Sequence, residues 1–174
     1  MNIYKFNLFN WKDQRGITLV ETLVSLVVLS LGLIPTLAIL TSSIRIASLI
    51  ENNLIAANLA QEGAEVARSL RDSNWFMNRA FSYTLIGQGR VQWDTNTTTN
   101  LPQPIGANPP LKFDSVTGRY NYTTGVDTQF RRSLTGTMSA NPCNCELIII
   151  SRVDWTQQGR NRTQSVESHL YNWR

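Results

Sequence analysis

One acid inside a membrane-length apolar run is the residue of this sequence with the most evident chemistry. Glu21 lies five positions after Gly16, in a run that continues to Leu40 and contains no other charged residue. A charged side chain at the centre of a bilayer costs about 2.5–3.5 kcal/mol on insertion scales, and such residues are usually paired. The identity of the group that pairs with Glu21 is therefore the strongest indication of function in this sequence.

Two cysteines are the next candidates for chemistry. Cys143 and Cys145 are separated by one residue, so in a strand both side chains would point to the same face. A disulfide between them would close a strained ring. A strained bridge, an intermolecular bridge and two free thiols all stay open. With His169 as the only histidine, these cysteines cannot complete a cysteine-based zinc site, and we expect no metal or cofactor.

The remaining polar residues do not predict a catalytic centre. No Ser or Cys nucleophile has a histidine and an acid in a recognisable motif, so we expect no enzyme. His169 is expected to be a surface or half-buried strand residue. A group of arginines on the predicted strands is expected to form a solvated face. After Gly16 the chain has 13 basic and 11 acidic residues, and this net charge of +2 is too small to favour nucleic acid. The arginines of this group are Arg131, Arg132, Arg152, Arg160 and Arg162.

The apolar run is typical of a targeting sequence or a membrane-spanning segment. Residues 17–40 are long enough to cross about 30 Å of hydrocarbon. Lys5, Lys12 and Arg15 precede the run, so residues 1–16 are expected in the cytoplasm and the C-terminal part outside it. The run could be a signal peptide cut near residues 41–43, a permanent anchor, or a helix retained after a cut at Gly16. It is long for a signal peptide, and no A-x-A-like site closes it.

Helical spacing predicts that one helix continues beyond the run to about residue 73. Residues 41–72 contain no proline, and alanines recur there at helical intervals. Pro35 removes a backbone hydrogen bond and is expected to kink or locally melt the helix. It is either an ordinary membrane-helix proline or a point that lets the segment stretch in a filament.

The C-terminal part, residues 74–174, is predicted to be a β-rich head. Residues 94–110 are nearly all turn formers and are predicted to form a surface loop. Residues 157–161 are predicted to form a hairpin turn. The apolar stretch 147–150 predicts a central strand covered on both faces. The fold class is therefore α+β, a long N-terminal helix packed on an antiparallel sheet, with candidate strands at 119–124, 129–137, 145–155 and 163–172.

The stretch from Arg15 to Glu21 resembles the processing motif of type IV pilins and pseudopilins. It reads Arg-Gly-Ile-Thr-Leu-Val-Glu, and precursors in that family have a basic leader ending in Gly, a residue that is usually Phe, then Thr, Leu, an aliphatic residue and Glu. The resemblance implies that a membrane aspartyl peptidase removes residues 1–16, cutting after Gly16, and methylates the new amine of Ile17. Ile17 in place of Phe and the unusual cysteine pair favour a minor pilin.

The resemblance also implies how the chain works. Thr18, Leu19, Glu21 and Pro35 would serve assembly, with Glu21 meeting the Ile17 amine of a neighbouring subunit in a staggered helical filament. Breaking such a buried pair costs about 3–5 kcal/mol. The implied partners are other pilin subunits, the prepilin peptidase, an inner-membrane assembly platform and lipid. The alternatives are a pseudopilin of a type II secretion or DNA-uptake apparatus and an anchored binding protein that does not polymerise.

Overall fold

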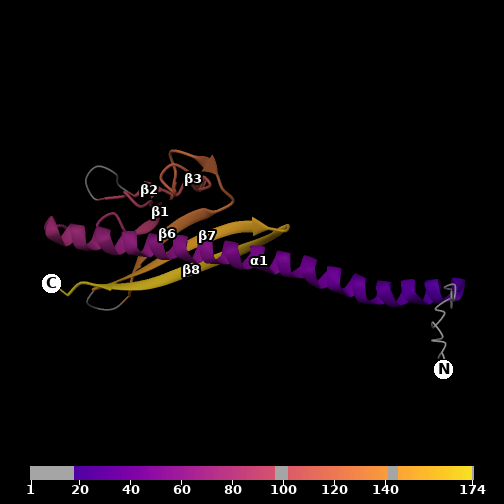
Figure 1. Cartoon of the computed structure of the whole chain (residues 1–174). Helices are drawn as coiled ribbons and strands as arrows, with labels where there is room; N and C mark the ends of the chain where they lie inside the picture. The colour runs from indigo at the N-terminus through magenta and orange to yellow at the C-terminus, as the bar shows by residue number, and fades with distance from the viewer. Residues whose placement is uncertain (1–17, 97–101, 141–144, 174) are drawn as a thin grey trace, which may run out of the picture. The chain divides into compact units, whose positions relative to one another are not determined.

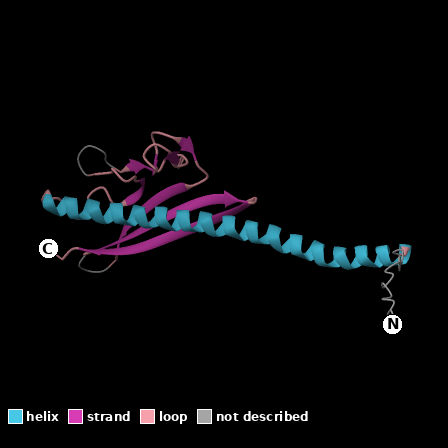
Figure 2. Cartoon of the chain, viewed as in Figure 1, coloured by secondary structure: helices cyan, strands magenta, loops and turns pink. Residues whose placement is uncertain are grey.

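In the residues that the structure describes, one long helix is followed by eight strands. Figures 1 and 2 show this helix together with the strands that follow it in the chain. The structure is a computed structural model that describes residues 18–96, 102–140 and 145–173. Helix α1 (Leu19–Phe76) has 58 residues and ends slightly beyond the predicted residue 73. The predicted α+β class, a long N-terminal helix and antiparallel sheets, is confirmed. The chain divides into two units, residues 1–46 and 47–174, each described by itself below.

In the first unit, α1 is apolar and exposed on every side. It contains the single stretch among the described residues that is long and apolar enough to cross a membrane. Five hydroxyl side chains donate hydrogen bonds of 2.7–3.0 Å to carbonyls of the preceding turn, which satisfies them without water, as hydrocarbon requires. These are Thr22, Ser30, Thr36, Thr41 and Ser43.

Pro35 does not interrupt this helix. It lies inside α1, and the helix is continuous on both sides of it. Because proline has no N–H, the carbonyl of Leu31 loses its normal helical donor. The predicted local melting is therefore absent, although one backbone hydrogen bond is missing at this point.

In the second unit, the main sheet is antiparallel and has five strands. Their order is β2 (Gln103–Pro104), β1 (Gly87–Arg90), β6 (Arg131–Met138), β7 (Glu146–Gln157) and β8 (Arg160–Tyr171). The longest pairing joins β7 to β8 from Glu146↔Tyr171 to Gln157↔Arg160.

The turn between β7 and β8 has two residues. Gln158 and Gly159 have φ values of 53° and 72°, the pattern of a tight hairpin turn. The turn predicted at 157–161 is thus shorter, because the strands extend into it. The predicted strand 145–155 corresponds to β7, 163–172 to β8, and 129–137 to β6.

A second sheet has three short strands, β4 (Arg119–Asn121), β3 (Lys112–Asp114) and β5 (Val126–Asp127). The predicted strand 119–124 ends early at Asn121, whose side-chain oxygen accepts hydrogen bonds from the backbone N–H groups of Thr123 and Thr124. This side-chain turn competes with strand extension. In the predicted loop 94–110, the structure adds the two-residue strand β2.

The core of the second unit lies between α1 and one face of the five-stranded sheet. Buried residues of α1 recur every three or four positions, as expected for one helix face. On β7 every second residue from Leu147 to Gln157 is buried, but Ile148 is half-buried and Ile150 is 37% exposed. The prediction that β7 is covered on both faces is therefore wrong, because α1 covers one face only. The buried helix residues are Ala56, Leu59, Ala60, Gly63, Ala64, Val66, Ala67, Leu70 and Asn74.

Arg132 is fully buried between the sheet and α1. Its guanidinium donates to the carbonyls of Leu59 and Val91 and forms a 3.0 Å ion pair with Glu62. The Tyr122 hydroxyl donates to the Arg132 carbonyl, 3.1 Å away. The prediction that the arginines form a solvated face is therefore wrong for Arg132. The register of β6 places this side chain on the sheet face that packs against the helix.

Gly63 makes room for this contact. A Cβ atom at Gly63 would lie 2.3 Å from Ser151 Oγ and 3.2 Å from Arg132 Cδ. We expect Gly63→Ala to lower the free energy of unfolding of the second unit by about 1–3 kcal/mol, because the added methyl group overpacks the interface. Denaturant unfolding followed by tryptophan fluorescence measures this. Gly32→Ala, where nothing lies within 4 Å, is the control, and equal stability of both variants would contradict the prediction.

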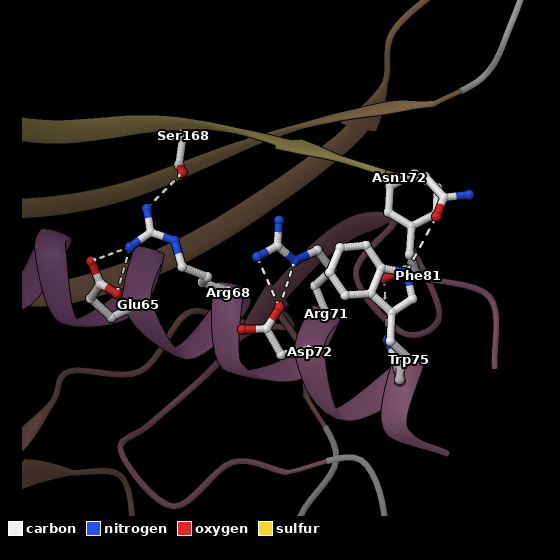
Figure 3. Close-up of polar contacts among 9 residues, drawn as sticks. Glu65, Arg68, Arg71, Asp72, Trp75, Phe81, Ser168 and Asn172 are labelled. Atoms are coloured by element: carbon white, nitrogen blue, oxygen red, sulfur yellow. Dashed lines mark hydrogen bonds and ion pairs between the residues drawn. The ribbon is translucent and has the colours of Figure 1, made fainter. Parts of the chain in front are cut away.

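The C-terminal end of α1 is held to its surroundings by polar side chains (Figure 3). Asn74 is buried and donates to the carbonyls of Phe81 and Tyr83, which folds the following segment back. The Trp75 indole donates to Asn172, and Arg68 donates to Ser168 at 3.5 Å. Helix and strands therefore keep a defined register at this end.

Candidate assembly site

The start of α1 is capped by its own sequence. The Thr18 hydroxyl accepts a 3.2 Å hydrogen bond from the backbone N–H of Glu21, and the Thr18 carbonyl accepts one from Thr22. Thr18 is thus the N-cap, and Glu21 is the third helical residue. Thr-x-x-Glu is the capping-box pattern, so helix initiation is encoded at this point.

The Glu21 side chain is exposed on the first turn of α1. An acid there is favoured by the helix dipole. Among the residues that the structure describes, no basic side chain forms an ion pair with Glu21. The carboxylate is exposed on a stretch of helix, residues 18–44, in which every other side chain is uncharged.

The other predicted site residues are placed as follows. Leu19 is the first residue of α1 and is 76% exposed, and Pro35 lies within the same helix. Gly16 and Ile17 lie outside the described residues, so the predicted cleavage and methylation site stays a prediction. The same holds for the pairing of Glu21 with an Ile17 amine.

The cysteine pair is described in part. Cys145 is disulfide-bonded and precedes β7. Its carbonyl accepts a 2.7 Å hydrogen bond from the N–H of Asn172, which joins the start of β7 to the end of β8. Cys143 lies outside the described residues, so the nature of the bridge stays a prediction.

The surface around Glu21 is uncharged and largely apolar. From Leu19 to Ile46, the large hydrophobic side chains of α1 are between 52% and 76% exposed. Such a continuous apolar surface indicates contact with lipid or with other proteins. A helix that is apolar all round is stable only when it is covered on every side, by a bilayer or by a bundle of similar helices.

A polar cluster that sequence reasoning did not find surrounds His169. This exposed residue of β8 bonds through Nδ1 to Glu146 at 2.7 Å and through Nε2 to Glu167 at 3.0 Å. The Tyr171 hydroxyl donates to the same Glu146 oxygen. The hydrogen bond with Glu146, and secondarily that with Glu167, raises the pKa of His169, because only the protonated ring donates from both nitrogens. The predicted surface position of His169 is confirmed.

This cluster predicts how stability depends on pH. The raised pKa of His169 contributes stability below the ordinary value of 6.5, and this is lost as pH rises through the raised value. The pKa of Glu146 is lowered, chiefly by the His169 bond, so its contribution is present above 4.5 and lost on acidification. We therefore expect the melting temperature of the second unit to peak between these values.

His169→Gln is expected to flatten the decline on the alkaline side of that maximum. Melting curves recorded by near-ultraviolet circular dichroism between about pH 4 and pH 9 measure it. Tyr171→Phe, which keeps both carboxylates beside the histidine, is the matched control. An unchanged pH profile in His169→Gln would show that the cluster is not the source.

The fold and the site together define a class of protein. The helix is apolar at its start and has one acid in its first turn, and its later half packs on an antiparallel sheet. This is the α+β architecture of a pilin-like protein. A family model for the prokaryotic N-terminal methylation motif matches residues 11–37. The chain therefore carries the signature of type IV pilins and pseudopilins. No curated protein and no solved structure matches it.

Proposed function

We propose that this chain is a minor pilin, a structural subunit of a type IV pilus without catalytic activity of its own. The observation that carries the proposal is the exposed Glu21, presented at the start of an apolar helix within the matched methylation motif. Cleavage after Gly16 would create a positive amine at Ile17. In a staggered bundle this amine is the cation that Glu21 lacks within the described chain.

The exposed apolar surface supports two successive environments for the helix. Before assembly, the segment spans the bacterial inner membrane, with the C-terminal domain exported. During assembly, an inner-membrane platform extracts the subunit, and the helices of other pilins replace lipid around it. The β-sheet unit is then displayed on the outside of the filament at the cell surface.

Mass spectrometry of the chain purified from its native membrane tests this proposal. The expected mature N-terminus is N-methyl-Ile17, with the leader 1–16 absent. An intact Met1 or a cut near Ser43 would overturn the pilin function and favour an anchored or secreted binding protein.

Electron microscopy of surface filaments tests the finer assignment. Immunogold labelling of the chain within a few surface pili, beside a more abundant subunit, is expected for a minor pilin. Confinement of the chain to the cell envelope would overturn the pilus assignment in favour of a secretion or DNA-uptake pseudopilus, because both groups share the methylation motif.

A further inference from the structure

The β7–β8 hairpin turn contacts α1 at Ser48, within the second unit. Gln157 Nε2 donates to the carbonyl of Ser48 at 3.2 Å and to its hydroxyl at 3.4 Å. Ser48 follows Leu40, the end of the apolar run, by eight residues, which is about 12 Å of helix. The headgroup layer of a bilayer is several ångströms thick. Only eight residues therefore join the contact at Ser48 to the apolar run, so the length of the chain keeps the hairpin turn within reach of the headgroups when that run spans a membrane.

The half of the β7–β8 hairpin between its middle and its turn, with the adjoining start of β6, carries a concentration of arginines. Arg131, Arg152 and Arg162 line one hollow of about 290 Å³, and Arg160 begins β8 beside it. The one acid lining the hollow is Asp154, which pairs with Arg152 at 2.8 Å. The cluster therefore keeps a net positive charge, and Arg131, Arg152 and Arg160 are exposed.

The opposite end of the same two strands is acidic. Glu146 and Glu167 lie there with His169, and the adjoining Asn172 bonds to Trp75 of α1. Trp75 lies 27 residues beyond Ser48, which is about 40 Å along the helix. The β7–β8 hairpin is thus acidic at the end beside Trp75 and basic toward the turn beside Ser48.

We propose that the hairpin-end arginines, Arg131, Arg152, Arg160 and Arg162, form a docking surface for anionic lipid headgroups. The proposal rests on the membrane-held stage of the proposed function, since the spanning helix brings the hairpin within reach of the bilayer. Arginine is suited to this contact because its planar guanidinium bonds phosphate oxygens in pairs. Docking would fix the orientation of the second unit on the membrane before the subunit is extracted.

Paramagnetic relaxation of backbone amides tests this surface in the full chain. The isotope-labelled protein is placed in nanodiscs that contain a trace of gadolinium-chelating lipid, with either neutral phosphatidylcholine or about 30% phosphatidylglycerol. We expect the amides of Gln158 and Gly159 to relax faster in the anionic discs. The difference should disappear at about 0.5 M salt, where screening is strong.

The decisive variant is Arg160→Gln/Arg162→Gln. Each basic residue near an anionic surface contributes about fivefold, so this variant should lower the ratio of docked to free hairpin about 25-fold. Arg68→Gln/Arg79→Gln removes the same charge near the C-terminal end of α1 and in the segment that follows it, and should behave as the unchanged chain. The amides of Leu147 and Ile149 report folding in the same spectra. If they shift, Arg160→Gln alone carries the test, with an expected fivefold loss.

Several results would overturn the proposal. Equal relaxation in neutral and anionic discs would do so, as would equal effects of the two double variants. Shifts of the same amides with inorganic phosphate, without dependence on lipid, would reduce the surface to a free-anion site. Saturable shifts with duplex DNA in neutral discs would assign it to nucleic acid. Failure of the chain to polymerise would overturn the proposed function and leave this result standing, because the experiment uses the membrane-held chain.

Discussion

Arg132→Ala is expected to lower the free energy of unfolding of residues 47–174 by about 3–5 kcal/mol. The guanidinium is completely buried, and its loss removes hydrogen bonds to Leu59 and Val91 and the ion pair with Glu62. The change also leaves a cavity between helix and sheet. Denaturant unfolding of the chain in detergent micelles, followed by tryptophan fluorescence, measures the loss.

The neighbouring Arg131→Ala is the matched control. Arg131 is exposed and donates to the carbonyl of Asn108, so its loss should cost less than about 1 kcal/mol. Glu62→Gln should be intermediate, about 2–3 kcal/mol, since the Glu62 side chain is 35% exposed and partly solvated. Arg132→Met with Glu62→Gln should recover much of the stability, because it fills the space without a buried charge. A cost for Arg132→Ala no larger than that for Arg131→Ala would contradict the structural role.

Glu21→Ala is expected to abolish incorporation of the chain into filaments, while cleavage after Gly16 continues. Loss of a buried pair worth about 3–5 kcal/mol at each subunit contact corresponds to a fall of at least about 100-fold in incorporation. Quantitative immunoblotting of sheared filaments measures incorporation, and mass spectrometry of the membrane fraction confirms that Ile17 is the first residue.

Glu21→Gln separates pairing from helix capping. Glutamine also occurs at the third position of a capping box, so this variant keeps the cap on Thr18 and removes the charge. If the charge is what assembly needs, Gln fails as completely as Ala. Normal incorporation of the Gln variant would show that the charge of Glu21 is not needed, and the intersubunit pair would then be withdrawn. Thr18→Ala, which removes the cap alone, completes the comparison.

The long-range contacts explain where sequence reasoning was wrong. Arg132 and Arg131 are adjacent in sequence, yet one is buried and the other exposed, because alternate residues of β6 face opposite sides of the sheet. That assignment depends on the pairing of Arg132 with Val153 of β7. A one-residue shift of the register would exchange the two arginines, and no local pattern reports it.

The apolar stretch of β7 was misread for a related reason. Four consecutive large apolar residues are typical of a strand buried on both faces. Here the sheet has one helix on one face, and Ile148 and Ile150 lie on the other, partly exposed face. How many layers cover a sheet is a property of the whole fold.

Two further features differ in how far the sequence alone displays them. Thr18-x-x-Glu21 is a capping box that the sequence displays directly. The cluster of Glu146, Glu167 and His169, by contrast, required the pairing of Ile148 with His169 across β7 and β8. Its members are up to 23 residues apart in sequence, and only the hairpin brings them together.

The sequence by itself determined the long apolar helix, its single acid and the α+β class. Helical spacing, hydropathy and the short motif ending at Glu21 are local properties, because each depends on residues that are close together in the sequence. Tertiary structure decided which arginine is buried, which sheet face is open, and that the hairpin turn lies beside Ser48. Those outcomes depend on strand register and on helix–sheet packing, which join residues up to 109 positions apart.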